Sequence, residues 1–238
     1  MRILIKVGGA QLESATGRAS FATSVAAARA AGHEVLVVHG GGAQLKELCA
    51  AVGLSELRFE GLRVTCARTS ELALGVLGGV VNKTLVRALE EAGVPAVGLT
   101  GVDGSGYAAR KFDADGVDLG FVGEVTSVDA RLVETLLATG YVPVLSSVAP
   151  LAPGESGDDT HLYNVNADAA AGALASAYGA DVLLLLTDVT AVRDADGEGI
   201  ACLDADRIHA LIANGVLQGG MLPKVRAALA DLTPVDAI

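Results

Sequence analysis

Two glycine-rich loops are the first feature of this 238-residue chain whose composition suits chemistry on a phosphate. Gly8-Gly9 and Gly40-Gly41-Gly42 each follow an apolar run of strand length and precede a stretch of helical spacing. Glycine lets backbone N–H groups approach phosphate oxygens closely, and the N-terminus of the following helix adds partial positive charge. Neither loop fits the P-loop or dinucleotide fingerprints, so an ordinary tight turn is an equal alternative for either loop alone.

Two lysines lie at positions that suit the same anion. Lys6 ends the first apolar run directly before Gly8, where a solvated lysine would be poorly placed. Lys224 follows Pro223, which suits the first turn of a helix, so its ammonium group would lie near a helix N-terminus. Taken singly, each lysine is explained slightly better as a surface residue.

Polar residues elsewhere are candidate ligand contacts, each with a structural alternative. Arg63 is a lone cation in an extended apolar context, which suits a bidentate clamp on a carboxylate or a structural ion pair. Asn164, Asn166 and Asp168 alternate where we expect a helix to begin, which suits ligand contacts or helix capping equally. His39 is the only histidine beside a glycine loop, and we favour a positioning role for it over catalysis.

A further candidate follows the most apolar run of the chain. Thr187, Asp188 and Val189 come directly after it and fit a loop near a nucleotide, or an ordinary turn at a strand end.

The elements that must position these residues alternate between strand-length apolar runs and longer helical stretches. This alternation predicts an α/β fold with a largely parallel sheet covered on both faces, whose carboxyl edge binds ligands. We expect strands at 2–7, 34–38, 94–99, 141–147 and 182–186, and a hairpin within 107–125 that flanks or covers a site. We expect helices at 19–30, 43–51, 70–92, 129–138, 164–175, 203–213 and 219–230.

Composition and charge narrow the class of protein. Apolar residues make up 51% and charged residues 19%, which is typical of one compact domain. The formal charge of −11 opposes binding to nucleic acid or an anionic membrane, since both require a basic surface. The apolar runs are too short to span a bilayer, and no secretory leader follows Met1, so we expect a cytoplasmic protein.

Taken together, these segments resemble the amino acid kinase family, and most closely its branch that phosphorylates N-acetyl-L-glutamate. The matching pieces span the chain in the family's order: Lys6-Val-Gly-Gly9, Val38-His-Gly-Gly-Gly42, Gly61-Leu-Arg-Val-Thr65, Val81-Asn-Lys83, Leu99-Thr-Gly-Val-Asp-Gly104, Gly120-Phe-Val-Gly-Glu-Val125, Tyr163-Asn-Val-Asn-Ala-Asp168, Leu186-Thr-Asp-Val189 and Gly219-Gly-Met-Leu-Pro-Lys224. The resemblance implies a three-layer αβα sandwich forming a single domain over 1–238. An acceptor-binding and dimerisation lobe would cover about 1–175, and an ATP-binding lobe about 176–238.

The resemblance also implies a role for each candidate residue. Lys6 and Lys224 would offset charge on the phosphoryl group that ATP, with Mg²⁺, transfers to a carboxylate, and Asp168 would hold both lysines in place. Contacts to the phosphoryl group are implied for Gly8 and Gly9, contacts to the acceptor for Gly41, Gly42, Arg63, Asn164 and Asn166, and contacts to ATP for Thr187, Asp188 and Val189. No protein residue is assigned as a metal ligand.

Differences from the family pattern leave alternatives open. Cys66 stands where an acidic residue is usual, so a local polar contact of the family is not expected here. Val102 stands where lysine is common, which keeps carrier-linked 2-aminoadipate or glutamate as alternative acceptors. The chain stops at Ile238, before a segment that family members have, so a binding module without turnover is a second alternative. Because the first strand begins at residue 2, without the extra helix of arginine-inhibited hexamers, we expect a homodimer without arginine inhibition.

Overall fold

The computed structural model describes residues 1–187, 191–200, 203–217 and 225. Its main sheet has the strand order β11-β1-β2-β8-β5, and every neighbouring pair runs parallel. These strands are β1 (Arg2–Val7), β2 (Glu34–His39), β5 (Ala96–Leu99), β8 (Val142–Ser146) and β11 (Val182–Leu185). The predicted parallel sheet is therefore confirmed.

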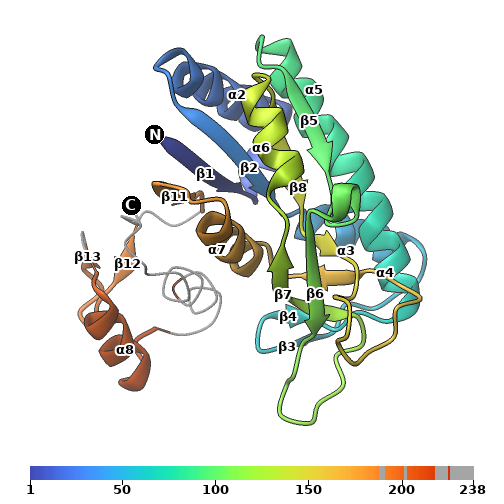
Figure 1. Cartoon of the computed structure of the whole chain (residues 1–238). Coiled ribbons are helices and arrows are strands. Elements are labelled where there is room, and N and C mark those ends of the chain that lie inside the picture. The colour runs from blue at the N-terminus through green and yellow to red at the C-terminus, as the bar shows by residue number, and fades with distance from the viewer. Residues whose placement is uncertain (188–190, 201–202, 218–224, 226–238) are drawn as a thin grey trace.

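Helices cover both faces of this sheet, because successive strand residues point to opposite sides. On one face, Ile5, Val37 and Val144 share a core with α2 (Ala15–Ala30) and α5 (Asn82–Glu91). On the other face, Leu4, Leu36 and Leu145 share a core with α6 (Arg131–Ala138) and α7 (Ala167–Ala177). Figure 1 shows α2 and α5 along one side of the sheet and α7 on the other, which confirms the predicted αβα sandwich.

The longest helical stretch runs over Ala67–Glu91 and changes its winding in the middle. It consists of α4 (Ala67–Ala73), a π-helical segment η1 (Leu74–Val81) and α5. The sequence predicted the helix but not the π-helical turns, which are rare and often lie near functional sites. By length and composition this stretch would suffice to cross a bilayer. Its apolar side chains Val76, Leu77, Val81, Leu85 and Leu89 instead belong to the core of the sandwich.

A second, mixed sheet lies beyond the carboxyl end of the first, in the order β6-β7-β10-β9. Its strands are β6 (Tyr107–Lys111), β7 (Val122–Val128), β9 (Val148–Ala149) and β10 (Tyr163–Val165). The predicted hairpin is confirmed as β6 and β7. The helix expected from residue 164 was placed too early, since Asn164 pairs with Val122 on one side and Val148 on the other.

The remaining elements are short. They are α1 (Ala10–Glu13), α3 (Gly42–Ala51), the hairpin of β3 (Arg58–Phe59) with β4 (Leu62–Arg63), a 3₁₀ turn η2 (Asp103–Ser105), the pair β12 (Val192–Arg193) and β13 (Gly199–Ile200), and α8 (Ala205–Ala213). Ile208 on α8 packs with Leu217 and Val225 in a small core of its own. Of the helix expected at 219–230 only Val225 is described, and it is helical.

Candidate active site

A pocket of about 320 Å³ lies where β1 and β2 end. It brings together nine residues proposed from the sequence: Lys6, Gly8, Gly9, Gly41, Gly42, Arg63, Asn164, Asn166 and Asp168. The two glycine loops meet there because β1 and β2 are parallel neighbours, with Val7 opposite His39. The expectation that both loops share one edge of the sheet is confirmed, while the roles of the residues stay predictions.

Lys6 and Asp168 form an ion pair at the base of the pocket. Lys6 Nζ lies 2.9 Å from Asp168 Oδ1, and each side chain is 10% exposed. Asp168 belongs to the first turn of α7, where the helix dipole favours a carboxylate. The Lys6 ammonium folds back toward Gly8, since a Cβ built there would lie 3.2 Å from Nζ. The pair therefore holds one cation beside the first glycine loop.

The second glycine loop keeps its carbonyl oxygens engaged by the protein. The Gly40 oxygen accepts a hydrogen bond from His39 Nδ1 at 2.7 Å. The Gly41 oxygen accepts one from the Leu45 N–H at 3.0 Å. The Gly42 oxygen accepts from Arg63 Nη2 at 2.9 Å. Among the described residues, no acceptor takes the N–H of Gly41, and Gly42 begins helix α3 with its own N–H unpaired. The oxygens of the loop are thus engaged within the protein, and the N–H groups of Gly41 and Gly42 are candidate donors to a ligand in the pocket that both residues line.

Gly41 needs to be glycine for two reasons. Its φ of 152° lies in the region that side chains rarely adopt. A Cβ at this position would also lie 2.7 Å from Leu77 Cδ2 and 3.1 Å from Val81 Cγ2. Both side chains come from the π-helical segment η1, which therefore supports the loop from behind.

Arg63 is held by an acidic residue that the sequence argument missed. Glu56 Oε1 lies 2.9 Å from Arg63 Nη2 and 2.7 Å from Arg58 Nη2. Burial opposes ionisation of Glu56, but the hydrogen bond from Arg58 and the charge of Arg63 outweigh it and lower the pKa of this carboxyl group. The Arg63 guanidinium uses Nη2 for both its contact with the Gly42 oxygen and its contact with Glu56. Arg63 thus both belongs to a structural ion pair and lines the pocket as a cation. For Glu56, the only signal in the sequence was the presence of an acidic residue close to Arg58.

The two asparagines have different surroundings. Asn164 lies on β10, and its Nδ2 donates to Thr65 Oγ1 at 3.2 Å. Asn166 is the N-cap of α7, with Oδ1 accepting from the N–H groups of Asp168 and Ala169. The capping alternative therefore holds for Asn166, which also lines the pocket.

His39 is a fully buried histidine just below the loop. Burial lowers its pKa to about 4; the hydrogen bond to Gly40 acts in the opposite direction, and the charge of Lys83 adds to the lowering. Its Nε2 lies 3.0 Å from Asn82 Nδ2, so both ring nitrogens have protein partners. His39 is therefore neutral at physiological pH and is not available as a general base.

The neutral state of His39 predicts a loss of stability in acid. The unfolded chain takes up the proton near pH 6.5 and the folded chain only near pH 4, so the free energy of unfolding falls as the pH drops between these values. Each pKa unit corresponds to about 1.4 kcal/mol, so the full loss is about 3 kcal/mol. Urea unfolding of the wild type and His39→Asn from pH 7 to pH 4 measures it as the difference between the two proteins. A difference that stays constant over this range would contradict the prediction.

Of the residues expected at the nucleotide, the structure describes Thr187. The Leu186 N–H donates to the Lys6 oxygen at 2.9 Å, which places Thr187 beside the end of β1. Asp188, Val189 and Lys224 lie outside the described residues, so their predicted roles stay predictions.

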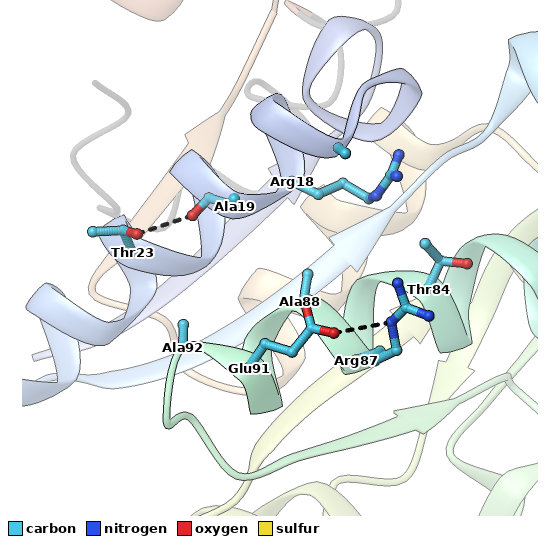
Figure 2. A pocket seen from close by; sticks show the side chains of 9 residues that line it. Arg18, Ala19, Thr23, Thr84, Arg87, Ala88, Glu91 and Ala92 are labelled. Carbon is cyan, nitrogen blue, oxygen red and sulfur yellow. Dashed lines mark hydrogen bonds and ion pairs between the residues drawn. The ribbon is translucent and has the colours of Figure 1, made fainter.

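Figure 2 shows another hollow, which lies between α2 and α5. Its volume is about 240 Å³. Its two arginines already have partners: Arg18 Nη1 donates to the Leu12 oxygen at 2.5 Å, and Arg87 Nε lies 3.2 Å from Glu91 Oε1. Arg87 and Glu91 are largely exposed, and no glycine loop reaches this hollow. The pocket at the ends of β1 and β2 is therefore the candidate active site.

Comparison with known proteins agrees with this fold and site. The family model described as "Amino acid kinase family" matches residues 1–232, and the chain belongs to this family. It is 48% identical over 227 residues to the acetylglutamate kinase of Koribacter versatilis, covering 95% of this chain and 84% of that protein.

Solved structures support the fold. The crystal structure of smu.665 from Streptococcus mutans UA159 is similar with a TM-score of 0.82 and 30% identity, covering 95% of this chain and 88% of that one. The carbamate kinase of Giardia has a TM-score of 0.68 at 16% identity, covering 100% of this chain and 91% of that one. The latter likeness concerns the fold alone.

Proposed function

We propose that this chain transfers the γ-phosphoryl group of ATP to the side-chain carboxylate of N-acetyl-L-glutamate, giving N-acetyl-L-glutamyl 5-phosphate and ADP. This is the activity expected of an enzyme of arginine biosynthesis. The observation that carries the proposal is the 48% identity, over 95% of this chain, to a protein named acetylglutamate kinase. The same comparison favours this acceptor over carrier-linked 2-aminoadipate or glutamate, and turnover over binding alone.

The chemistry requires no general base. A glutamate side chain has a reference pKa of about 4.3, so the attacking carboxylate is already ionised at neutral pH. One of its oxygens forms a bond to the γ-phosphorus, while the bond from that phosphorus to the β,γ-bridging oxygen breaks and ADP leaves. The enzyme must align two anions and stabilise charge spread over the phosphoryl oxygens. A buried, neutral His39 with both nitrogens engaged is consistent with this requirement.

The pocket residues suit these tasks. The ammonium of Lys6, fixed by Asp168, lies where it would offset charge on the transferring group. The N–H groups of Gly41 and Gly42 are donors directed at anionic oxygens. We assign Arg63 to the α-carboxylate of the acceptor, because a guanidinium group matches a carboxylate in geometry. Gly8 and Gly9 line the same space and would contact the phosphoryl group.

Magnesium would enter with the nucleotide. Among the described residues lining the pocket, Asp168 is the one carboxylate, and its Oδ1 is already paired with Lys6. Within the same residues no group of three or more acidic, histidine or cysteine side chains is arranged to hold a metal. Phosphate oxygens and water, which Mg²⁺ commonly retains as ligands, would therefore provide most of its coordination. When bound, the ion supplies positive charge to the phosphates.

Trapping the acyl phosphate with hydroxylamine tests the proposal. We expect a hydroxamate with ATP, Mg²⁺ and N-acetyl-L-glutamate, and at least about tenfold less product with glutamate, aspartate or 2-aminoadipate at equal concentration. The reason is that the one acid lining the described pocket, Asp168, is already paired with Lys6 and is therefore committed before a free α-amino group arrives. Product from 2-aminoadipate alone would favour the alternative acceptor. Binding of ATP and N-acetyl-L-glutamate without product would favour the binding module.

Three further expectations remain proposals: the cytoplasmic location, the homodimer, and the division into an acceptor lobe at about 1–175 and an ATP lobe at about 176–238. Exposed apolar side chains on the helix at 67–91 support the proposed homodimer, since Leu74 is 42% and Val80 66% exposed.

A further inference from the structure

We infer that His39 is a positioning residue of the reaction: through its Nδ1–H it fixes the Gly40 carbonyl so that the Gly41 N–H points into the pocket as a donor to the transferring phosphoryl group. The inference rests on the proposed function, which supplies that group. It concerns a histidine that touches no substrate, since the pocket is lined by the glycines above it.

The direction of each hydrogen bond follows from its partners. The Gly40 oxygen only accepts, so His39 Nδ1, 2.7 Å away, must carry the proton. Nε2 of a neutral ring then has only a lone pair, and it accepts from Asn82 Nδ2 at 3.0 Å. The same Asn82 amide group donates to the Val144 oxygen at 2.9 Å, which orients it independently of His39. One tautomer of His39 satisfies all three contacts.

The frame around His39 has no room to rearrange. His39 and Asn82 are both fully buried. Asn82 fits because residue 98 on β5 is glycine, where a Cβ would lie 1.8 Å from Asn82 Oδ1. The Asn82 side chain is thus fixed between β5 and β8, and it holds the imidazole ring in turn.

The geometry of the peptide bond links the fixed Gly40 carbonyl to the direction of the Gly41 N–H. In a trans peptide the C=O and the following N–H point in opposite directions. The Gly40 carbonyl is drawn down toward His39, and the Gly40 N–H is held by the Val7 oxygen at 3.1 Å. The Gly41 N–H must therefore point away from His39, to the side where the pocket lies. A glycine pair without this tether would be free to flip the peptide and present an oxygen to the phosphoryl group.

Replacing His39 by asparagine or by glutamine distinguishes the role of Nδ1 from that of Nε2. His39→Asn can place an N–H close to the position of Nδ1, while His39→Gln reaches the position of Nε2 and leaves the Gly40 carbonyl without its donor. We expect kcat of His39→Asn to stay within about fivefold of the wild type and kcat of His39→Gln to fall about 100-fold, as for the loss of one oriented donor. KM for ATP should stay within about threefold in both. Thermal unfolding of each variant measures the fraction of folded protein at the assay temperature, and the fall in kcat should be larger than any fall in this fraction.

The comparison overturns the inference if His39→Gln retains wild-type kcat, or if both variants lose activity in proportion to their stability. A binding measurement distinguishes failure of the inference about His39 from failure of the proposed function. MgADP alone should raise the melting temperature of all three proteins equally. The additional rise on adding aluminium fluoride, which mimics the transferring group, should occur in the wild type and His39→Asn and be lost in His39→Gln. This result requires no turnover of N-acetyl-L-glutamate.

The wild type provides a test that does not depend on folded variants. Nitrogen-15 NMR of histidine-labelled protein should find His39 neutral, with the proton on Nδ1, from pH 7 down to about pH 5. A proton on Nε2 instead would overturn the inference, because the Gly40 carbonyl would then have no donor.

Discussion

Replacing Lys6 by methionine is expected to lower kcat about 100- to 1000-fold, with KM for N-acetyl-L-glutamate changed less than about threefold. The side chain keeps its length but loses the charge that would face the phosphoryl oxygens as their negative charge redistributes. Removal of one preorganised electrostatic contact typically costs this much in kcat. Hydroxamate formation at saturating ATP and acceptor measures the change.

This substitution also removes the Lys6 ammonium from its ion pair with Asp168. The Lys6–Asp168 pair is only 10% exposed on each side, and breaking a buried pair from one side is costly, about 3 to 5 kcal/mol when no water reaches the remaining charge. The double variant Lys6→Met/Asp168→Asn removes both charges and should recover part of the stability without recovering kcat. Lys111→Met is a matched control, since Lys111 is 41% exposed on β6 and paired with Asp118. Wild-type turnover in Lys6→Met would exclude Lys6 from the mechanism.

Replacing Arg63 by alanine is expected to raise KM for N-acetyl-L-glutamate about 100-fold, with a smaller effect on kcat. Truncation of one member of a buried, hydrogen-bonded charge pair costs about 2 to 5 kcal/mol, partly because the remaining charge is left unpaired. Here the charge left unpaired would be the acceptor carboxylate, because Glu56 keeps Arg58 as a partner at 2.7 Å. Arg63→Lys should recover little, because an ammonium lacks the planar fork that reaches Glu56, Gly42 and a ligand together.

A control for Arg63 comes from the same region of the chain. Arg68 on α4 is 62% exposed and pairs with Glu71, so Arg68→Ala removes an arginine without entering the pocket. Its KM for the acceptor should stay within about twofold. If Arg63→Ala binds the acceptor as tightly as Arg68→Ala does, Arg63 serves only the structure of the β3–β4 hairpin.

The parts of the site that the sequence predicted lie where strand signals are strong. The apolar runs that end in Lys6 and His39 define β1 and β2, and their parallel pairing alone brings the two glycine loops together. Short-range patterns were enough for the loops, since each depends on one strong strand and its neighbour. The nearness of Asp168 to Lys6 was instead implied by the resemblance to the amino acid kinase family, and α7 brings it there on the face of the sheet that carries Leu4.

The missed features depend on contacts between distant segments. Strand β10 is only three residues long, and it exists because β7 and β9 supply partners on both sides. The local Asn and Asp pattern signalled only the helix that follows. Asn82 acts through His39, 43 positions earlier in the chain. The π-helical winding of η1 likewise has no periodic signal, because its apolar and glycine residues suit an α-helix as well.

The orientation of the second glycine loop has a consequence for what the enzyme admits. With a formal charge of −11, the molecule attracts metal ions and amines from solution to its surface. At the loop, however, the oxygens of Gly40, Gly41 and Gly42 are already occupied by His39, Leu45 and Arg63. A bare cation would therefore have to compete with a hydrogen bond for each of these oxygens. The loop thus favours an anion over a cation, and we expect a divalent ion to bind here together with the phosphates of the nucleotide.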